Sequence, residues 1–185
     1  VYERARLLCV TNHGPLGIDT LNERISTALL ARSGQAQTET FAGLPVMITR
    51  NLHDLGLFNG DTGILWLIDG ELRACFRQPD ATGESGAIRD LALNRLTDIK
   101  PAWAITVHKS QGSEFDSVLL LLPSELPSDL LSRELLYTGI TRARNAFLLQ
   151  APLPALSQAI SRLTRRHSGL AARLGWPADA PIPGP

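Results

Sequence analysis

The sequence contains little cysteine and no long apolar run. Its two cysteines, Cys9 and Cys75, both lie inside short apolar stretches, which predicts buried free thiols and not a disulfide or a metal pair. The four histidines are scattered without the spacing of zinc ligands, so we expect no metal site. No apolar run approaches the roughly 18 residues of a membrane span, and no signal peptide is visible. We therefore expect a cytoplasmic protein with no membrane partner.

The sequence also has no excess of charge of either sign. Its 18 basic residues balance its 18 acidic residues, and only Lys100 and Lys109 are lysines. Proteins that hold nucleic acid by charge alone are usually strongly basic, so any such contact in this chain is expected to be local. Hydrophobic residues make up 44% of the chain, which is enough to bury a core and excludes a disordered chain.

Two motifs of nucleotide hydrolases are absent from the sequence. No G-x-x-x-x-G-K-[ST] loop occurs to cradle a β-phosphate, because the candidate at 14–17 lacks the lysine. No acidic pair follows an apolar strand, so a Walker B magnesium site is not predicted. The chain begins without methionine, directly before an apolar run, and we interpret it as a fragment. We expect this fragment alone to hold neither ATP nor Mg²⁺.

The first part of the chain follows an α/β pattern. An apolar run at 6–11 predicts a strand, and Asp19 is placed to cap a helix that Gly34 ends. Strand, loop and helix in this order are typical of an α/β layer. The residues spaced to form the buried face of this helix are Leu21, Ile25, Ala28 and Leu29.

From about residue 43 the pattern changes to short strands. The turn signals Asn59-Gly60-Asp61 and Asp69-Gly70 separate them. Short strands at this spacing predict a small barrel, and residues 43–97 are enough for an SH3-like module. The predicted strands are 44–49, 63–68, 72–76 and 88–93.

Near Pro101 the α/β pattern returns. The predicted elements are a strand end at 103–107, a buried parallel strand at 117–122, a helix at 132–144, a strand at 146–150 and a helix from Pro154 with Leu156, Ile160 and Leu163 on one face. The predicted fold class is therefore α/β, a parallel sheet with flanking helices that a small all-β barrel interrupts. Residues 177–185 form a proline-rich tail.

The densest polar segment lies between two of these predicted strands. It reads A-I-T-V-H-K-S-Q-G-S-E-F-D at 104–116, and core packing does not explain so many polar side chains. Loops at the carboxyl ends of parallel strands are where open α/β sheets bind ligands. Composition alone leaves open a plain polar loop that turns at Gly112.

A second polar segment reads E-L-L-Y-T-G-I-T-R-A-R at 134–144. On a helix, Thr138 and Arg142 share one face, and Arg144 points roughly the opposite way. At most one of the two arginines is then expected to reach a given ligand. The alternative is two solvated arginines near a helix C-terminus, where the helix dipole favours them.

Together these segments resemble motifs V and VI of superfamily 1 DNA helicases, in the form found in the RecD family of exodeoxyribonuclease V subunits. The matching patterns are T-V-H-K-S-Q-G-S-E-F-D at 106–116 and Y-T-G-I-T-R-A-R at 137–144. Residues 7–22 resemble the motif IV region, and 46–63 the start of an inserted barrel. The resemblance implies a RecA-like second motor domain at 1–42 and 98–176, interrupted by an SH3-like barrel at 43–97.

The resemblance also implies a nucleotide site between two motor domains. Arg142 is then the catalytic arginine that reaches the γ-phosphate of ATP. Gly112, Glu114 and Thr138 are then ATP-binding residues, with the glycine allowing close approach and the carboxylate accepting from a ribose hydroxyl. In the full-length protein the implied cofactors are ATP and Mg²⁺.

Five residues are implied or proposed as contacts to single-stranded DNA. Thr106, His108 and Lys109 resemble the part of motif V that faces the strand. Arg50 and Asn51 belong to the predicted barrel, and for them an exposed loop is the alternative. One departure from the family pattern is Asn12, followed by His13, where such proteins carry a basic residue. Neither is taken as a site.

The implied function is the C-terminal part of an ATP-dependent helicase in recombinational repair that moves on single-stranded DNA, toward the 3′ end if RecD-like. The implied partners are single-stranded DNA, an N-terminal motor domain, and RecB- and RecC-like subunits. Two alternatives stay open: a non-catalytic docking module for subunits or DNA, and another superfamily 1 helicase of the Pif-like or Upf-like kind.

Overall fold

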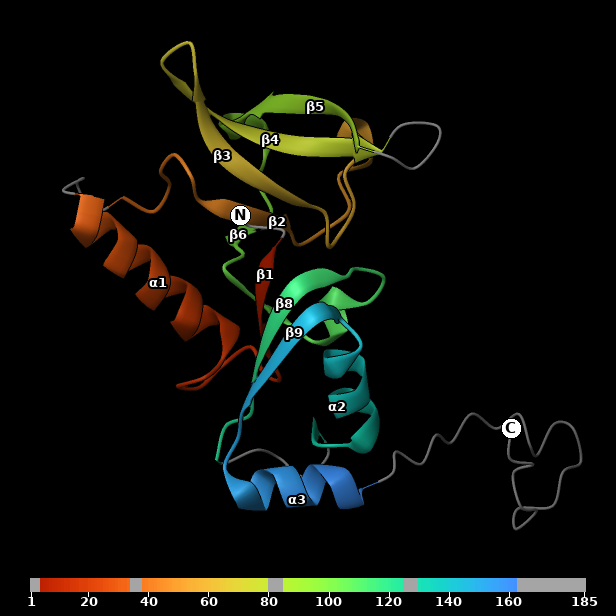
Figure 1. Ribbon diagram of the computed structural model, residues 1–185. Helices are drawn as coiled ribbons and strands as arrows, with labels where there is room; N and C mark the ends of the chain where they lie inside the picture. Colours follow the sequence, from red (N-terminus) through yellow and green to blue (C-terminus); the bar gives the residue numbers. More distant parts are fainter. Residues whose placement is uncertain (1–3, 34–37, 80–84, 125–129, 163–185) are drawn as a thin grey trace, which may run out of the picture.

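Two sheets make up the described part of the chain. The computed structural model describes residues 4–33, 38–79, 85–124 and 130–162; Gly34, Leu163 and the predicted tail lie outside these ranges. One sheet is parallel with four strands, and the other is antiparallel with five. Figure 1 shows the antiparallel sheet above the parallel one, with α1 and α2 flanking the latter. The predicted α/β fold class, a parallel sheet with flanking helices, is confirmed.

The parallel sheet has the strand order β7-β1-β8-β9. Its strands are β1 (Ala5–Cys9), β7 (Ala104–Thr106), β8 (Phe115–Leu121) and β9 (Ala143–Gln150). Alternate residues of these strands point to one face, where Leu8 lies level with Ile105 on one side and Leu120 on the other. All three are buried in one apolar cluster, as expected for parallel strands that helices cover.

Helices α2 (Arg133–Ile140) and α3 (Leu153–Ser161) cover that face. The Ser132 hydroxyl caps α2 by accepting from the Leu135 backbone N–H at 3.2 Å. In α3 the buried residues are Ala155 and Ala159, while Ile160 is 52% exposed. The predicted buried face of α3 is therefore wrong at Ile160, because small residues let this helix pack closely.

Helix α1 (Ile18–Ser33) is anchored mainly by polar contacts, and of the predicted apolar face Leu21 and Ile25 are half-buried whereas Ala28 and Leu29 are exposed. The Asn22 side chain donates to the Ala104 carbonyl at 3.1 Å and accepts from the Ala104 N–H at 2.9 Å. The Trp103 indole N–H donates to the Ser26 hydroxyl at 3.0 Å. The buried residues of α1 are Asn22 and Leu30, whereas Leu29 is 39% exposed. The prediction failed because α1 docks on the edge strand β7, whose free backbone groups select polar partners.

The antiparallel sheet has the order β5-β4-β3-β2-β6. Its strands are β2 (Pro45–Ile48), β3 (Thr62–Ile68), β4 (Glu71–Pro79), β5 (Ser85–Ala92) and β6 (Ile99–Pro101), with short 3₁₀ turns η1 (His53–Leu55) and η2 (Leu93–Arg95). Every predicted strand run of this block falls on one of β2 to β5. The sheet has its own apolar core, which includes Val46, Leu65 and Phe76.

All five strands lie in the sequence between α1 and β7, so the antiparallel sheet interrupts the α/β unit. Strand β6 pairs with β2 as far as Pro101, which lies past the predicted boundary at residue 97. The closed SH3-like barrel and the domain limits stay predictions.

Only Ala102 and Trp103 separate β6 from β7, and these two residues form hydrogen bonds with three other elements. The Ala102 N–H donates to the Pro45 carbonyl at 2.9 Å. The buried Arg6 guanidinium donates to the Ala102 carbonyl at 3.3 Å and lies over the Phe115 ring, 4.7 Å from its centroid. Trp103 is held by α1, as described above. The two sheets are therefore joined by a two-residue segment that several hydrogen bonds hold in place.

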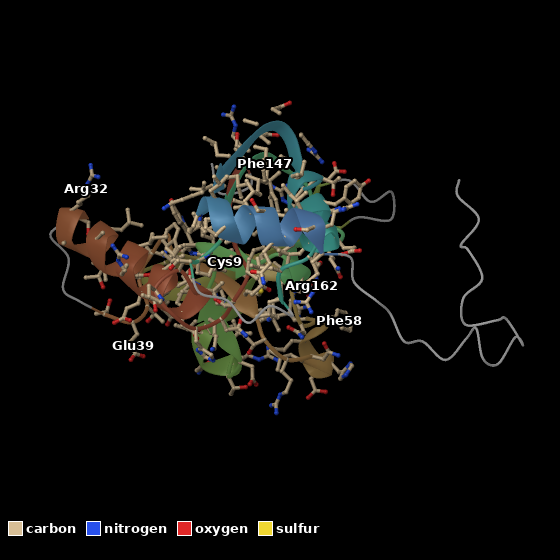
Figure 2. The ribbon with its side chains drawn as sticks, turned by 90° about the horizontal axis from the view of Figure 1, so that it is seen from below. Cys9, Arg32, Glu39, Phe58, Phe147 and Arg162 are labelled. Atoms are coloured by element: carbon tan, nitrogen blue, oxygen red, sulfur yellow. The ribbon has the colours of Figure 1, made fainter. Side chains whose placement is uncertain are left out.

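The two cysteines differ in burial. Cys9 is fully buried at the centre of the molecule (Figure 2), and burial raises the pKa of its thiol to about 12. Cys75 is half-buried, so the expectation of two buried thiols is wrong there; burial, followed by the nearby Asp90 carboxylate, raises its pKa as well. In the described ranges no helix is long and apolar enough to cross a membrane.

Candidate nucleotide and nucleic-acid site

Residues 107–114 run back across the parallel sheet from one end to the other. Thr106 ends β7 level with Cys9 at the carboxyl end of β1, whereas Ser117 near the start of β8 is level with Ala5. The short turn η3 (His108–Ser110) lies on this return path. The expectation of a loop at the carboxyl ends of the strands therefore applies to Thr106 but not to Gly112 and Glu114, because a second parallel strand must start at the opposite edge.

Arg142 lies at the amino end of β9, beside the end of this return path. Its guanidinium donates from Nη1 to the Ser113 carbonyl at 2.9 Å and from Nε to the Thr138 carbonyl at 3.2 Å. Nη2 makes a longer contact of 3.4 Å with the Thr141 hydroxyl. The side chain is half-buried. The structure thus holds the arginine on the exposed rim that carries residues 112–114, and not in the core.

The backbone around Arg142 differs from the predicted helix. Helix α2 ends at Ile140, and the Arg142 carbonyl accepts from the Phe115 N–H at 2.8 Å. Ala143 then pairs with Phe115 as the first residue of β9. The predicted helix to residue 144 is wrong because pairing with β8 draws the chain into the sheet. The orientation of Arg142 is therefore fixed from both the helix and the strand.

Arg144 joins the same rim, contrary to the prediction that it points away from Arg142. Its Nε lies 3.1 Å from Oε2 of Glu114, and both side chains are more than half exposed. Arg142 lies in the turn before β9 and Arg144 at an irregular position of the strand, where the register with β8 shifts, so the helical spacing that would have turned them apart does not apply. Both arginines therefore reach the 113–114 segment, and Glu114 is already paired with a cation.

Gly112 and Thr138 complete the predicted nucleotide set. Gly112 has a φ of +82°, and no atom lies within 4 Å of the place where its Cβ would stand. A glycine in this conformation leaves the backbone open to close approach. The Thr138 hydroxyl donates to the Glu134 carbonyl at 2.8 Å. Thr138 contributes to this rim through its backbone carbonyl, which accepts a hydrogen bond from Arg142.

The predicted DNA-binding residues fall into a buried part and an exposed part. Thr106 is only 9% exposed, and its hydroxyl accepts from the Lys109 N–H at 3.3 Å. Thr106 therefore shapes the turn η3, which presents His108 and Lys109 to solvent. Buried Ser110 supports the same turn by donating to the Val107 carbonyl at 2.7 Å.

Lys109 connects this turn to the loop between β2 and β3. Its Nζ donates to Oδ1 of Asn59 at 3.2 Å, and the Asn59 N–H donates to Oδ1 of Asn51 at 2.9 Å. Lys109 and Asn51, predicted from separate segments, are thus brought together. Arg50 lies next to Asn51 in the chain, but its Nη2 pairs with Oδ2 of Asp98 at 3.1 Å.

Two residues of this arrangement were not predicted from the sequence. Asn59 was interpreted as part of a strand-linking turn, because N-G-D is a strong turn signal that hides any second role. Ser113 contributes a backbone carbonyl, which no residue type reveals. His13 is turned elsewhere, since its Nδ1 lies 2.9 Å from Oδ2 of Asp19.

The rim around Arg142 fits a phosphate anion. A guanidinium has five N–H donors, and in the part of the chain that the structure describes three of those of Arg142 are engaged. Its charge is permanent, and its planar donors match phosphate oxygens. Gly112 adds an open backbone nearby. No group of three His, Cys, Asp or Glu residues suited to a metal ion occurs within the described ranges.

Comparison with known proteins relates this region to a helicase family. The family described as UvrD-like helicase C-terminal domain matches residues 101–149, which include the return path and Arg142. The RecBCD enzyme subunit RecD of Mycobacterium tuberculosis is 41% identical over 170 residues, covering 91% of this chain and 28% of that protein. The ATP-dependent RecD2 DNA helicase of Deinococcus radiodurans is 31% identical over 174 residues, covering 91% of this chain and 23% of that protein.

The fold has solved counterparts. A crystal structure of Pif1 helicase from Bacteroides in complex with ADP-AlF3 and ssDNA matches with a TM-score of 0.52 and 16% identity, covering 96% of this chain and 46% of that chain. At this identity the match shows a shared fold. The chain spans about a quarter of the length of the curated relatives it matches. Similarity along nearly its whole length shows that the chain belongs to the RecD family and contains a UvrD-like helicase C-terminal domain.

Proposed function

We propose that this chain is the second motor half of an ATP-driven helicase that moves along single-stranded DNA. The observation that carries the proposal is the bond from Arg142 to the Ser113 carbonyl, which holds a half-buried cation on an exposed rim. The RecD2 relative is named an ATP-dependent DNA helicase, which supports the same activity. Because the chain spans about a quarter of such relatives, the activity belongs to a longer polypeptide.

In this proposal Arg142 is the catalytic residue. ATP, when bound, supplies the phosphoanhydride bond whose hydrolysis releases free energy. Arg142 offers its remaining donors to the γ-phosphate and neutralises the charge that develops there. Gly112 allows the backbone to approach the nucleotide, and Glu114 accepts a hydrogen bond while Arg144 holds it in place. Thr138 positions Arg142 through its carbonyl. Mg²⁺ is assigned to the other motor domain.

The same polypeptide segment carries the proposed DNA contacts. His108 and Lys109 lie on the return path only a few residues before Gly112, and Asn51 lies beyond Asn59. A movement of the rim on nucleotide binding or release is therefore passed to the DNA contacts through a short stretch of chain. Single-stranded DNA is accordingly the proposed substrate, with movement toward its 3′ end.

The proposed partners follow from the relatives. One of them is named a subunit of the RecBCD enzyme, so we assign RecB- and RecC-like subunits as partners of the full-length protein. An N-terminal motor domain supplies the phosphate-binding loop that this sequence lacks.

The decisive experiment replaces Arg142 by alanine in the full-length protein. We expect the turnover number for DNA-stimulated ATP hydrolysis to fall roughly 10³-fold or more, because the transition-state charge loses its partner. ATP affinity, measured with a fluorescent analogue, should change only a few-fold. Arg142→Lys should not restore turnover, since a point charge replaces a planar fork.

The matched control is Arg144→Ala, which removes an equally close arginine from the same rim. This variant should lose far less turnover than Arg142→Ala, because Arg144 positions Glu114 and is not proposed to reach the γ-phosphate. Near-normal hydrolysis in Arg142→Ala would contradict the assignment and favour a non-catalytic docking module.

A further inference from the structure

The loop between β2 and β3 is firmly anchored up to residue 57. Leu55 and Leu57 are 6% and 5% exposed and belong to the core of the antiparallel sheet. Leu57 forms an isolated bridge with Leu52. The Arg89 guanidinium donates to the Leu55 carbonyl at 2.7 Å, which fixes the loop from β5. The residue that follows this anchor is therefore held in a defined place.

That residue, Phe58, is turned outward. Its side chain is 51% exposed, and Figure 2 shows it at the edge of the molecule. The Phe58 N–H donates to Oδ2 of Asp61 at 2.8 Å, and the Asp61 N–H donates to the Phe58 carbonyl at 3.0 Å. The His53 ring meets Phe58 edge to face, with centroids 6.0 Å apart and planes at 81°. The ring is thus presented by an ordered turn.

Exposure alone does not mark a site, because single exposed apolar side chains are common. The second observation is a cation bound to the residue that follows Phe58 in the chain. Lys109 Nζ donates to Asn59, the residue next to Phe58, and His108 is exposed on the same turn as Lys109. A basic side chain near an exposed aromatic ring is a combination with which proteins bind single strands without reading their sequence.

We propose that Phe58 is a stacking platform for one base of the single strand whose backbone Lys109 holds. The inference rests on the proposed function and adds a base contact to its proposed DNA contacts. The charges near the ring separate the expected positions of the phosphates and the base. Asp54 and Asp61 belong to the Phe58 loop and repel phosphates, so the sugar-phosphate backbone runs on the Lys109 side and the base lies on the ring. His53 supports the ring from its edge.

The test compares Phe58 variants of the full-length protein on two probes. One probe is a fluorescein-labelled oligothymidylate, and the other is an abasic strand of the same length, both read by fluorescence anisotropy. Phe58→Ala should weaken binding of the oligothymidylate roughly 5- to 100-fold and leave binding of the abasic strand unchanged. Phe58→Trp should bind as tightly as the wild type or tighter, whereas Phe58→Leu should resemble Phe58→Ala.

Trp66 provides the matched control. It lies on β3 opposite Arg73 and is 54% exposed, so Trp66→Ala removes an equally exposed aromatic side chain from the same sheet. This variant should bind both probes like the wild type.

Three outcomes would overturn the inference. They are oligothymidylate binding by Phe58→Ala within two-fold of the wild type, an equal loss on the abasic strand, and a loss of subunit assembly with unchanged DNA affinity. The last outcome would make the ring a protein contact. If the wild type bound neither probe, the proposed function itself would fail; if it bound and Phe58→Ala bound equally well, only this inference would fail.

Discussion

Arg142 and Arg144 are identical side chains on one rim, but their partners differ and so do their proposed roles. Arg142 donates to backbone carbonyls, which fix its direction without neutralising its charge. Arg144 faces the Glu114 carboxylate, and that ion pair compensates its charge. An exposed pair of this kind contributes about 0–1 kcal/mol to stability. The cation available to an incoming anion is therefore Arg142.

The thiols also differ residue by residue, and this difference predicts their reactivity. The pKa of Cys9 is raised to about 12 by burial, so its thiolate is scarce near neutral pH, whereas Cys75 is half-buried. We expect iodoacetamide to modify Cys75 well before Cys9 in the folded protein. Peptide mapping by mass spectrometry measures the two rates. Faster modification of Cys9 would contradict the burial.

The same shift gives a dependence of stability on pH. In the unfolded chain the Cys9 thiol ionises near its ordinary pKa of 9.0, whereas in the folded chain it stays protonated up to about 12. The stabilising contribution of the protonated thiol is thus fully present below pH 9 and is lost as the pH rises toward 12. Cys9→Ala should remove this part of the alkaline destabilisation.

At the residue scale, the sequence was informative where a side chain itself carries the chemistry. Arg142, Glu114 and Lys109 were singled out through the resemblance to helicase motifs, and the structure brings the first two to one rim. Arg144 was misplaced because a helix was predicted where a strand begins, and the direction of a side chain depends on that choice. The Ser113 carbonyl had no signal, since every residue has one.

Helix α1 and strand β7 show how an element is held by polar bonds. Asn22 pairs with both backbone groups of Ala104 and so takes the place of a neighbouring strand. Strand β7 lies at the edge of the parallel sheet, and an unpaired edge is open to aggregation. The Asn22 amide, which is only 6% exposed, therefore closes part of this edge.

This arrangement predicts a clear loss of stability in Asn22→Ala. The variant leaves the Ala104 N–H and carbonyl without their partners, and each buried unsatisfied group costs about 1–3 kcal/mol. We expect the free energy of unfolding to fall by about that amount or more, as measured by urea denaturation. Arg24→Ala, an exposed site on the same helix, should change it by less than about 0.5 kcal/mol. Equal effects in the two variants would contradict the docking role of Asn22.

At the element scale, strands were predicted better than helix faces. Runs such as 63–68 and 117–122 are apolar throughout or flanked by turns, and each falls on an observed strand. The face of α1 was wrong because the rule places large apolar residues inside. Helix α1 packs against the edge strand β7, and the Asn22 amide can both donate to and accept from the free backbone groups of that strand. For α3 the same rule failed because Ala155 and Ala159 allow closer packing than leucine.

For the whole molecule, neutral net charge makes the position of each lysine matter. The two lysines lie in different places: Lys109 reaches Asn59 between the two sheets, whereas Lys100 pairs with Asp19 of α1 at 3.5 Å. Only Lys109 belongs to the proposed DNA track. We therefore expect the affinity for single-stranded DNA to depend on where each lysine lies and not on the net charge of the chain.

A salt titration of DNA binding tests this division. In Lys109→Ala the slope of log K against log salt for single-stranded DNA should become shallower by about 0.7, because one phosphate contact is lost. Lys100→Ala, which removes the same charge from the other side, should keep the slope of the wild type. A shallower slope in both variants would mean that the lysines act only through the overall charge.

The junction at Ala102 and Trp103 has a mechanical consequence. Residues of β2, β1 and α1 form hydrogen bonds with Ala102 and Trp103. We therefore expect little rotation of the antiparallel sheet relative to β7. A force on the loop between β2 and β3 is then expected to displace β7, which ends at Thr106. In the proposed motor, a movement of one sheet is therefore expected to be transmitted directly to the other.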